Sequence, residues 1–170
     1  MISKKMTKSI NDQINKELYS AYLYLGMATF AAGKGFPGAA NWFSVQVKEE
    51  MTHAEKFFNY VNQQGERVLL DAIEKPPQDF KSLLNCFEET LKHEKKVTGL
   101  INDLVDIAKK EKDHATEAAL QWFVSEQVEE ESSAQEIIQK FKLIGNDGSG
   151  LPTIDSQLAT RVFTPSVAGA

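Results

Sequence analysis

The stretch WFVSEQVEEES, residues 122–132, decides the fold. It has the composition of a helix that begins with large apolar side chains and then gathers four carboxylates and an amide. At 100° per residue, positions seven apart differ by only about 20°, so Phe123, Glu130 and Ile137 lie on one stripe of this helix. A glutamate therefore stands where the helical period demands a core residue.

Three other long segments repeat this pattern. In each of them a glutamate near the middle has an apolar residue seven positions before it and another seven positions after it. The triplets are Ile10–Glu17–Tyr24, Phe43–Glu50–Phe57 and Phe87–Glu94–Ile101. Because each glutamate lies near the midpoint of its segment, the sequence predicts that four helices bring their glutamates together at one depth.

Breaks in the helical pattern define the segments. Sparse proline and glycine residues leave four long helical stretches and one short one, at about 3–32, 38–64, 79–110, 113–144 and 154–163. β-Branched residues do not alternate with polar ones, so strands are not expected. The connection ERVLLDAIEKPPQ, residues 66–78, can extend to about 40 Å, which lets the second and third helices run parallel.

These features predict an all-α fold in a single domain over residues 1–170. A four-helix bundle spans about 3–144, with one long crossover between its second and third helices, and a short fifth helix follows. The apolar residues Val68-Leu69-Leu70 of the crossover need packing partners, and an isolated helix of about ten residues is not stable. We therefore expect a homo-oligomer.

Composition and charge narrow the class of protein. A net charge of −5 argues against a nucleic-acid-binding surface. The single cysteine, Cys86, excludes an internal disulfide and fits a reducing compartment. The N-terminal MISKKMTKSIND lacks the apolar core of a signal peptide, and no apolar run approaches the ~18 residues of a membrane span. We expect a cytoplasmic protein that binds neither membrane nor nucleic acid.

The inward glutamates need a counter-charge. A single one of them can pair with a lysine or reach towards solvent, but no lysine or arginine lies beside any of the four on its stripe. Unpaired buried carboxylates cost several kcal/mol each or take up protons. His53 lies three positions after Glu50, and Gln127 lies three before Glu130 on the inward side. Carboxylates with one imidazole suit iron or manganese, with zinc as a competitor, so the sequence predicts a metal centre.

Three further glutamates, Glu49, Glu126 and Glu129, lie at the edges of the same stripes, and we call them the flank carboxylates. They form either a second oxygen-rich site beside the first or an ordinary solvated acidic face. Tyr24 also points inward, where a tyrosine is more often a core residue than a redox group.

Four motifs resemble one known family. They are KELYSAYLY at 16–24, EEMTHAE at 49–55, KHE at 92–94 and WFVSEQVEEE at 122–131. Ferritin-like di-iron proteins carry a glutamate on each of two helices and Glu-x-x-His on each of the other two. Here Glu50 and His53 form one such pair, while Gln127 and Glu130 replace the second. That replacement is similar to the bacterial non-haem ferritin family, and the resemblance covers essentially the whole chain.

The resemblance implies a hollow cage of 24 subunits that stores iron. Ferrous iron would be oxidised by O₂ or H₂O₂ at a di-iron centre, which makes the protein a ferroxidase, and deposited inside as ferric oxyhydroxide mineral. One iron would be held by Glu17, Glu50 and His53, and the second by Glu94, Glu130 and Gln127. A third iron would lie among Glu49, Glu126, Glu129 and Glu130. Tyr24 resembles the tyrosine beside the centre, an electron donor.

Two alternatives stay open at this point. A bacterioferritin would bind haem between subunits, and Met51 stands where that family has its haem ligand. The pair Gln127 and Glu130 argues against it, so we expect no haem. A metal-free helical interaction protein is the other alternative, and in it the inward glutamates would be dispensable.

Overall fold

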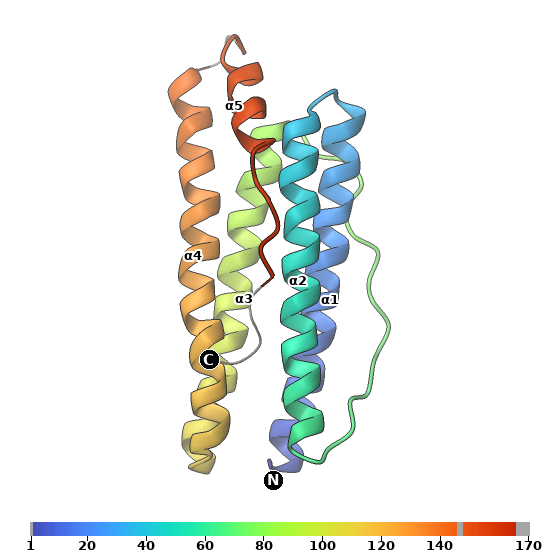
Figure 1. Ribbon diagram of the computed structural model, residues 1–170, viewed down its shortest axis with the longest axis vertical. Coiled ribbons are helices and arrows are strands. Elements are labelled where there is room, and N and C mark those ends of the chain that lie inside the picture. Colours follow the sequence, from blue (N-terminus) through green and yellow to red (C-terminus); the bar gives the residue numbers. More distant parts are fainter. Residues whose placement is uncertain (1, 146–147, 166–170) are drawn as a thin grey trace.

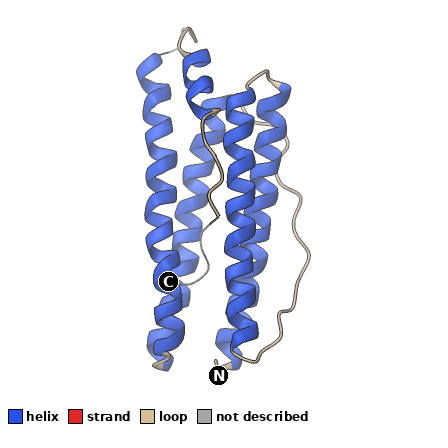
Figure 2. Ribbon diagram, viewed as in Figure 1, coloured by secondary structure: helices blue, strands red, loops and turns tan. Residues whose placement is uncertain are grey.

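Side-chain caps and a proline fix where the long helices begin. The computed structural model describes residues 2–145 and 148–165, and these form helices and loops only. The oxygens of Ser3, Ser82 and Asp113 accept hydrogen bonds at 3.0 Å from the backbone N–H three residues on, and each such cap is worth about 1 kcal/mol. The helices are α1 (Lys4–Gly33), α2 (Pro37–Gln63), α3 (Leu83–Glu111), α4 (His114–Ile144) and α5 (Leu151–Leu158) (Figures 1 and 2).

The predicted four-helix bundle with one long crossover is confirmed (Figure 1). The crossover runs the length of the bundle beside α1, so α2 and α3 are parallel. Asn11 holds it by donating to the carbonyl oxygen of Arg67 at 3.4 Å and accepting from the N–H of Leu69 at 3.2 Å. Among the described residues, no helix is long and apolar enough to cross a membrane.

Two predicted helix boundaries were wrong. The third helix begins at Leu83 instead of near residue 79, because the chain stays extended beyond Pro77 until Ser82 caps the helix. The fifth helix spans Leu151–Leu158 instead of about 154–163. It begins earlier because Pro152 fits a first turn, and contacts of the following residues with α2 draw the chain out of the helix after it.

The crossover only partly needs a second subunit. Val68 packs against the apolar core of its own chain, whereas Leu69 and Leu70 are 60% and 69% exposed. Of the three residues that were expected to need packing partners, Val68 therefore finds them within its own chain.

Two apolar clusters fill the described part of the bundle, one towards each end. Phe43 and Phe87 stack at 4.9 Å between ring centroids in one cluster, and Phe57 and Phe123 stack at 3.9 Å in the other. In every predicted triplet, one apolar end lies in the first cluster and the other end lies in the second. The four glutamates are consequently held between the clusters, at one depth of the bundle.

Candidate metal centre

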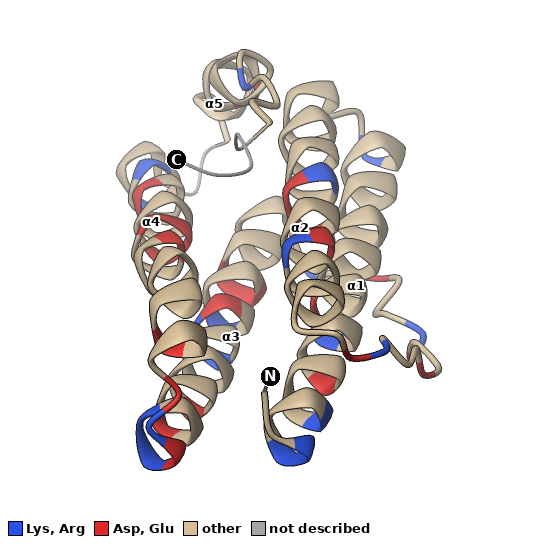
Figure 3. Cartoon of the chain, turned by 60° about the horizontal axis from the view of Figure 1, so that its bottom comes forward, with Lys and Arg blue, Asp and Glu red and all other residues tan. Residues whose placement is uncertain are grey.

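The four inward glutamates are buried in the layer between the clusters. Glu17, Glu50, Glu94 and Glu130 are only 1%, 2%, 1% and 6% exposed, and each comes from a different long helix. Acidic positions fall partway along α2, α3 and α4 (Figure 3). Helical periodicity turns these side chains inward, because their apolar neighbours two turns away are anchored in the clusters.

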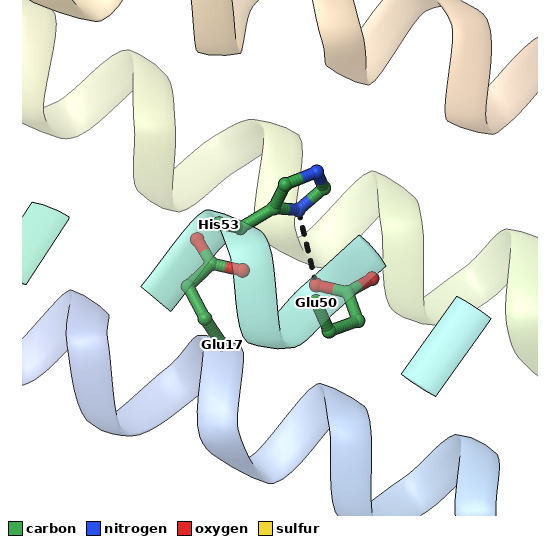
Figure 4. Close-up of side chains that lie close together, drawn as sticks. All are labelled: Glu17, Glu50 and His53. Atoms are coloured by element: carbon green, nitrogen blue, oxygen red, sulfur yellow. Dashed lines mark hydrogen bonds and ion pairs between the residues drawn. The ribbon is translucent and has the colours of Figure 1, made fainter. Parts of the chain in front are cut away.

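Glu17, Glu50 and His53 form a compact group. Figure 4 shows the carboxylates of Glu17 from α1 and Glu50 from α2 turned towards the His53 ring. One ligand atom from each lies within 4.8 Å of the others, and His53 Nδ1 is 3.2 Å from Glu50 Oε2. One imidazole nitrogen and two carboxylates at this spacing can hold a transition-metal ion.

The other nitrogen of His53 faces a flank carboxylate. Nε2 lies 3.7 Å from Oε1 of Glu126, and His53, Glu126 and Glu130 make a second group of possible ligands within 4.8 Å. The rings of Trp122 and Phe123 pack edge-on against the imidazole. His53 therefore connects the central group to the flank, and a carboxylate partner on the far nitrogen is what orients a metal-binding histidine.

Hydrogen bonds organise the second half of the centre. The hydroxyl of Tyr24 donates to Oε1 of Glu94. The amide of Gln127 donates to Oε2 of Glu94 at 3.2 Å, and the amide of Gln46 donates to Oε2 of Glu130 at 2.9 Å. Tyr24 therefore contacts the centre through its hydroxyl, while its buried ring packs in the apolar core.

The electrostatics of the centre call for a cation. Burial raises the pKa of Glu17, Glu50 and Glu130, and burial with the nearby charge of Glu130 raises the pKa of Glu94 to about 8. Burial opposes the charged form of His53, yet the carboxylates of Glu50, Glu126 and Glu17 together outweigh it and raise the pKa of His53. Among the described residues, none of the four glutamates makes an ion pair with a lysine or an arginine.

Two buried glutamines were missed from the sequence. Gln13 donates to Oε1 of Glu17 at 2.7 Å, and Gln46 contacts Glu130 as described above. Each lies four residues before a central glutamate, so the repeated spacing Gln-x-x-x-Glu was the available signal. Oε2 of Glu17 and Oε1 of Gln46 are buried without a hydrogen-bond partner. These two acceptors fit a centre that binds a cation.

The flank carboxylates are not all brought together. Glu126 is half-buried beside His53, whereas Glu129 is exposed. Glu49 pairs instead with Arg161, whose Nη2 lies 2.5 Å from Oε2 of the carboxylate. Burial raises the pKa of Glu49 to about 7, although the charge of Arg161 opposes the rise. No sequence pattern had indicated a role for this arginine.

Known proteins are similar to this chain over nearly its full length. The ferritin-like domain family matches residues 7–144. The bacterial non-heme ferritin of Campylobacter jejuni is 42% identical over 93% of this chain and 95% of that protein. A probable bacterial non-heme ferritin-like protein of Haemophilus influenzae is 43% identical over 93% and 96%. The crystal structure of an open pore ferritin from the archaeon Archaeoglobus fulgidus superposes with a TM-score of 0.94 at 48% identity, covering 95% of this chain and all of that one.

Proposed function

This chain belongs to the ferritin family, as an iron-storing ferroxidase of the non-haem kind, and we propose which of its residues oxidise the iron. One observation carries the proposal. Four glutamates from four helices and one histidine are buried together, and none of the four glutamates has a lysine or arginine ion-pair partner in the described residues. Ferrous iron supplies the missing positive charge and is itself the substrate.

We propose two adjoining iron positions. Glu17, Glu50 and His53 bind the first iron, and Glu50 has a second oxygen with which to bridge. Glu94 and Glu130 bind the second iron. Gln127 fixes the orientation of Glu94 through its amide and offers a weaker ligand than a carboxylate would. A loosely held second ion suits a site that must release its product.

The ligand set drives the oxidation. Hard, anionic carboxylates favour Fe(III) over Fe(II), so they lower the reduction potential of bound iron. Two neighbouring ferrous ions together give two electrons to O₂, which takes up two protons and leaves as H₂O₂. Because buried carboxyls with raised pKa values hold protons in the metal-free protein, iron binding releases protons into this centre. Tyr24, bonded to Glu94, is placed to donate a further electron.

We also propose a third iron position at the flank carboxylates. Glu126 and Glu130 lie within 4.8 Å of a His53 nitrogen, and Glu49 and Glu129 are the chain neighbours of Glu50 on α2 and Glu130 on α4. The double variant Glu49→Ala/Glu129→Ala should keep fast oxidation but change the ratio of iron to oxygen consumed. If an oxygen electrode records the wild-type ratio over repeated additions of iron, the flank carboxylates are only a solvated face.

The proposed assembly is a closed, cytoplasmic shell of 24 copies around the mineral. Ferritins are known as cages, and this subunit leaves Tyr22, Leu25, Leu69 and Leu70 between 45% and 69% exposed along α1 and the crossover. Large apolar side chains left exposed on two elements that run side by side favour association between subunits. The relatives are non-haem proteins, so Met51 is not expected to bind haem.

Removal of a central ligand tests the proposed ferroxidase residues. Glu50→Ala and His53→Ala should slow the oxidation of ferrous iron severely in stopped-flow absorbance, while circular dichroism shows an intact bundle. Glu55→Ala, an exposed glutamate on the same helix, is the matched control and should oxidise iron at the wild-type rate. Wild-type rates in both ligand variants would refute the assignment.

A further inference from the structure

The segment that follows α5 folds back along α2 (Figure 1). The amide nitrogen of Asn41 donates to the carbonyl oxygens of Ala159 at 3.3 Å and Arg161 at 2.9 Å. Upstream, the carboxylate of Asp155 accepts from the N–H groups of Gly38 at 3.1 Å and Ala39 at 2.8 Å. That contact caps the first turn of α2. We call residues 159–165 the C-terminal strap; its position on α2 is specified by these bonds.

The strap delivers a positive charge to the flank carboxylates. Nη2 of Arg161 lies 2.5 Å from Oε2 of Glu49, and the guanidinium carbon lies 4.3 Å from the centroid of the Trp42 ring. Both members of the ion pair are only 22% exposed. Charge-assisted hydrogen bonds and cation–π contacts are strengthened when water is excluded, so this pair is more than a surface ion pair.

The charge of Arg161 reaches beyond Glu49. Its positive charge opposes the rise in the pKa of Glu130, a central glutamate. The negative charges of Glu130 and Glu126 in turn raise the pKa of Glu49. The guanidinium therefore interacts with the same carboxylates that a cation bound at the flank would contact. An iron ion at the flank would have to take the oxygens of Glu49 from Arg161, because two positive charges at such short range repel each other.

The ion pair between Arg161 and Glu49 also has a feature that makes it easier to break. Nη1 of Arg161 is buried and has no hydrogen-bond partner. An unsatisfied buried donor lowers the net stability of the closed arrangement. A divalent ion carries twice the charge of the guanidinium, so it can take over the carboxylate once its concentration is sufficient.

We propose that Arg161 is a built-in competing cation that holds Glu49 and makes iron binding at the flank carboxylates conditional on its displacement. This inference rests on the proposed function, since it assumes that the flank takes iron. The two central iron positions are occupied first. The third position fills only when iron drives the strap away from Glu49, which makes Arg161 a determinant of how many ions each subunit binds.

Anaerobic calorimetric titration of the intact assembly with ferrous iron tests this proposal. Arg161→Gln should tighten binding of the weakest ion about tenfold or more, which is about 1.4 kcal/mol, and leave the two tighter ions unchanged. Asn41→Ala, which loosens the strap but keeps the arginine, should act in the same direction. Arg67→Gln, on the crossover, is the control and should bind iron as the wild type does.

The double variant Arg161→Gln/Glu49→Gln tests whether Arg161 acts by holding the Glu49 carboxylate. The gain from Arg161→Gln should vanish in it, because the carboxylate that the arginine releases is gone. A gain that persists in the double variant overturns the proposal, as does unchanged binding of the weakest ion in Arg161→Gln. A wild-type protein that binds no ferrous iron at the two tighter positions would instead refute the ferroxidase assignment, so the two failures are distinguishable.

Discussion

Replacing Glu94 by glutamine should change how the stability of the metal-free protein depends on pH. Glu94 is 1% exposed, and burial with the charge of Glu130 raises its pKa from 4.5 to about 8. Below pH 4.5 this carboxyl is protonated in both the folded and the unfolded chain. Between pH 4.5 and about 8 the folded chain keeps a proton that the unfolded chain has released, so the stability of the fold falls as pH rises.

The size of the effect follows from the two pKa values. The unfolding free energy should fall by about 1.4 kcal/mol for each pH unit in this range, and in total by about 5 kcal/mol at most. Water that enters a metal-free centre screens the charge, so we expect a loss of about 2 to 4 kcal/mol between pH 5 and pH 8.5. Glu94→Gln removes this contribution, because an amide does not ionise in that range.

Urea unfolding followed by circular dichroism measures this difference. Wild type, Glu94→Gln and the exposed control Glu88→Gln are compared with a chelator present, at equal subunit concentration because assembly stabilises the fold. Wild type and the control should lose stability with rising pH more steeply than Glu94→Gln. Zinc ions at pH 8 should then stabilise the wild type more than Glu94→Gln, since zinc takes up the carboxylate charge. Parallel pH profiles for all three proteins would refute the reasoning.

The effects of three other variants follow from the surroundings of single residues. Gln46→Met removes the hydrogen bond to Glu130, and iron oxidation in stopped flow should slow about 10- to 100-fold with the bundle intact; an unchanged rate would mean that Glu130 needs no support. A methyl group added in Gly38→Ala would lie 1.7 Å from the backbone oxygen of Asp155, so α5 should leave α2 and trypsin should cleave the C-terminal strap faster than in wild type. Leu70→Glu places a charge on an exposed apolar surface, and analytical ultracentrifugation should show smaller species than the closed shell of the wild type. Equal cleavage rates or equal sedimentation would contradict the respective prediction.

Much of the fold follows from local sequence pattern. The seven-residue spacing around Glu17 and Glu130 depends only on helix geometry, so the placement of their apolar neighbours in two clusters could be predicted. The ends of the helices were harder to predict, because a segment beside a possible capping residue can also stay extended. The chain could have begun a helix soon after Pro77, yet it stays extended until Ser82 since the crossover must still reach the far end of the bundle.

The centre could be predicted only where its residues share a helical stripe. The convergence of Glu50 and His53 is a consequence of their spacing, although their role as iron ligands stays a prediction. The pairing of Glu49 with Arg161 spans 112 positions and depends on where the strap is anchored. No local pattern encodes such a contact, so the sequence suggested an open flank site where the structure has an arginine.

Anomalous X-ray diffraction from crystals soaked anaerobically in ferrous iron tests the central claim most directly. Data collected on both sides of the iron absorption edge should show two strong peaks in the layer between the apolar clusters. One should lie among Glu17, Glu50 and His53, and the other beside Glu94 and Glu130. A bundle interior without anomalous density, with the four carboxylates still buried and metal-free, would contradict the account.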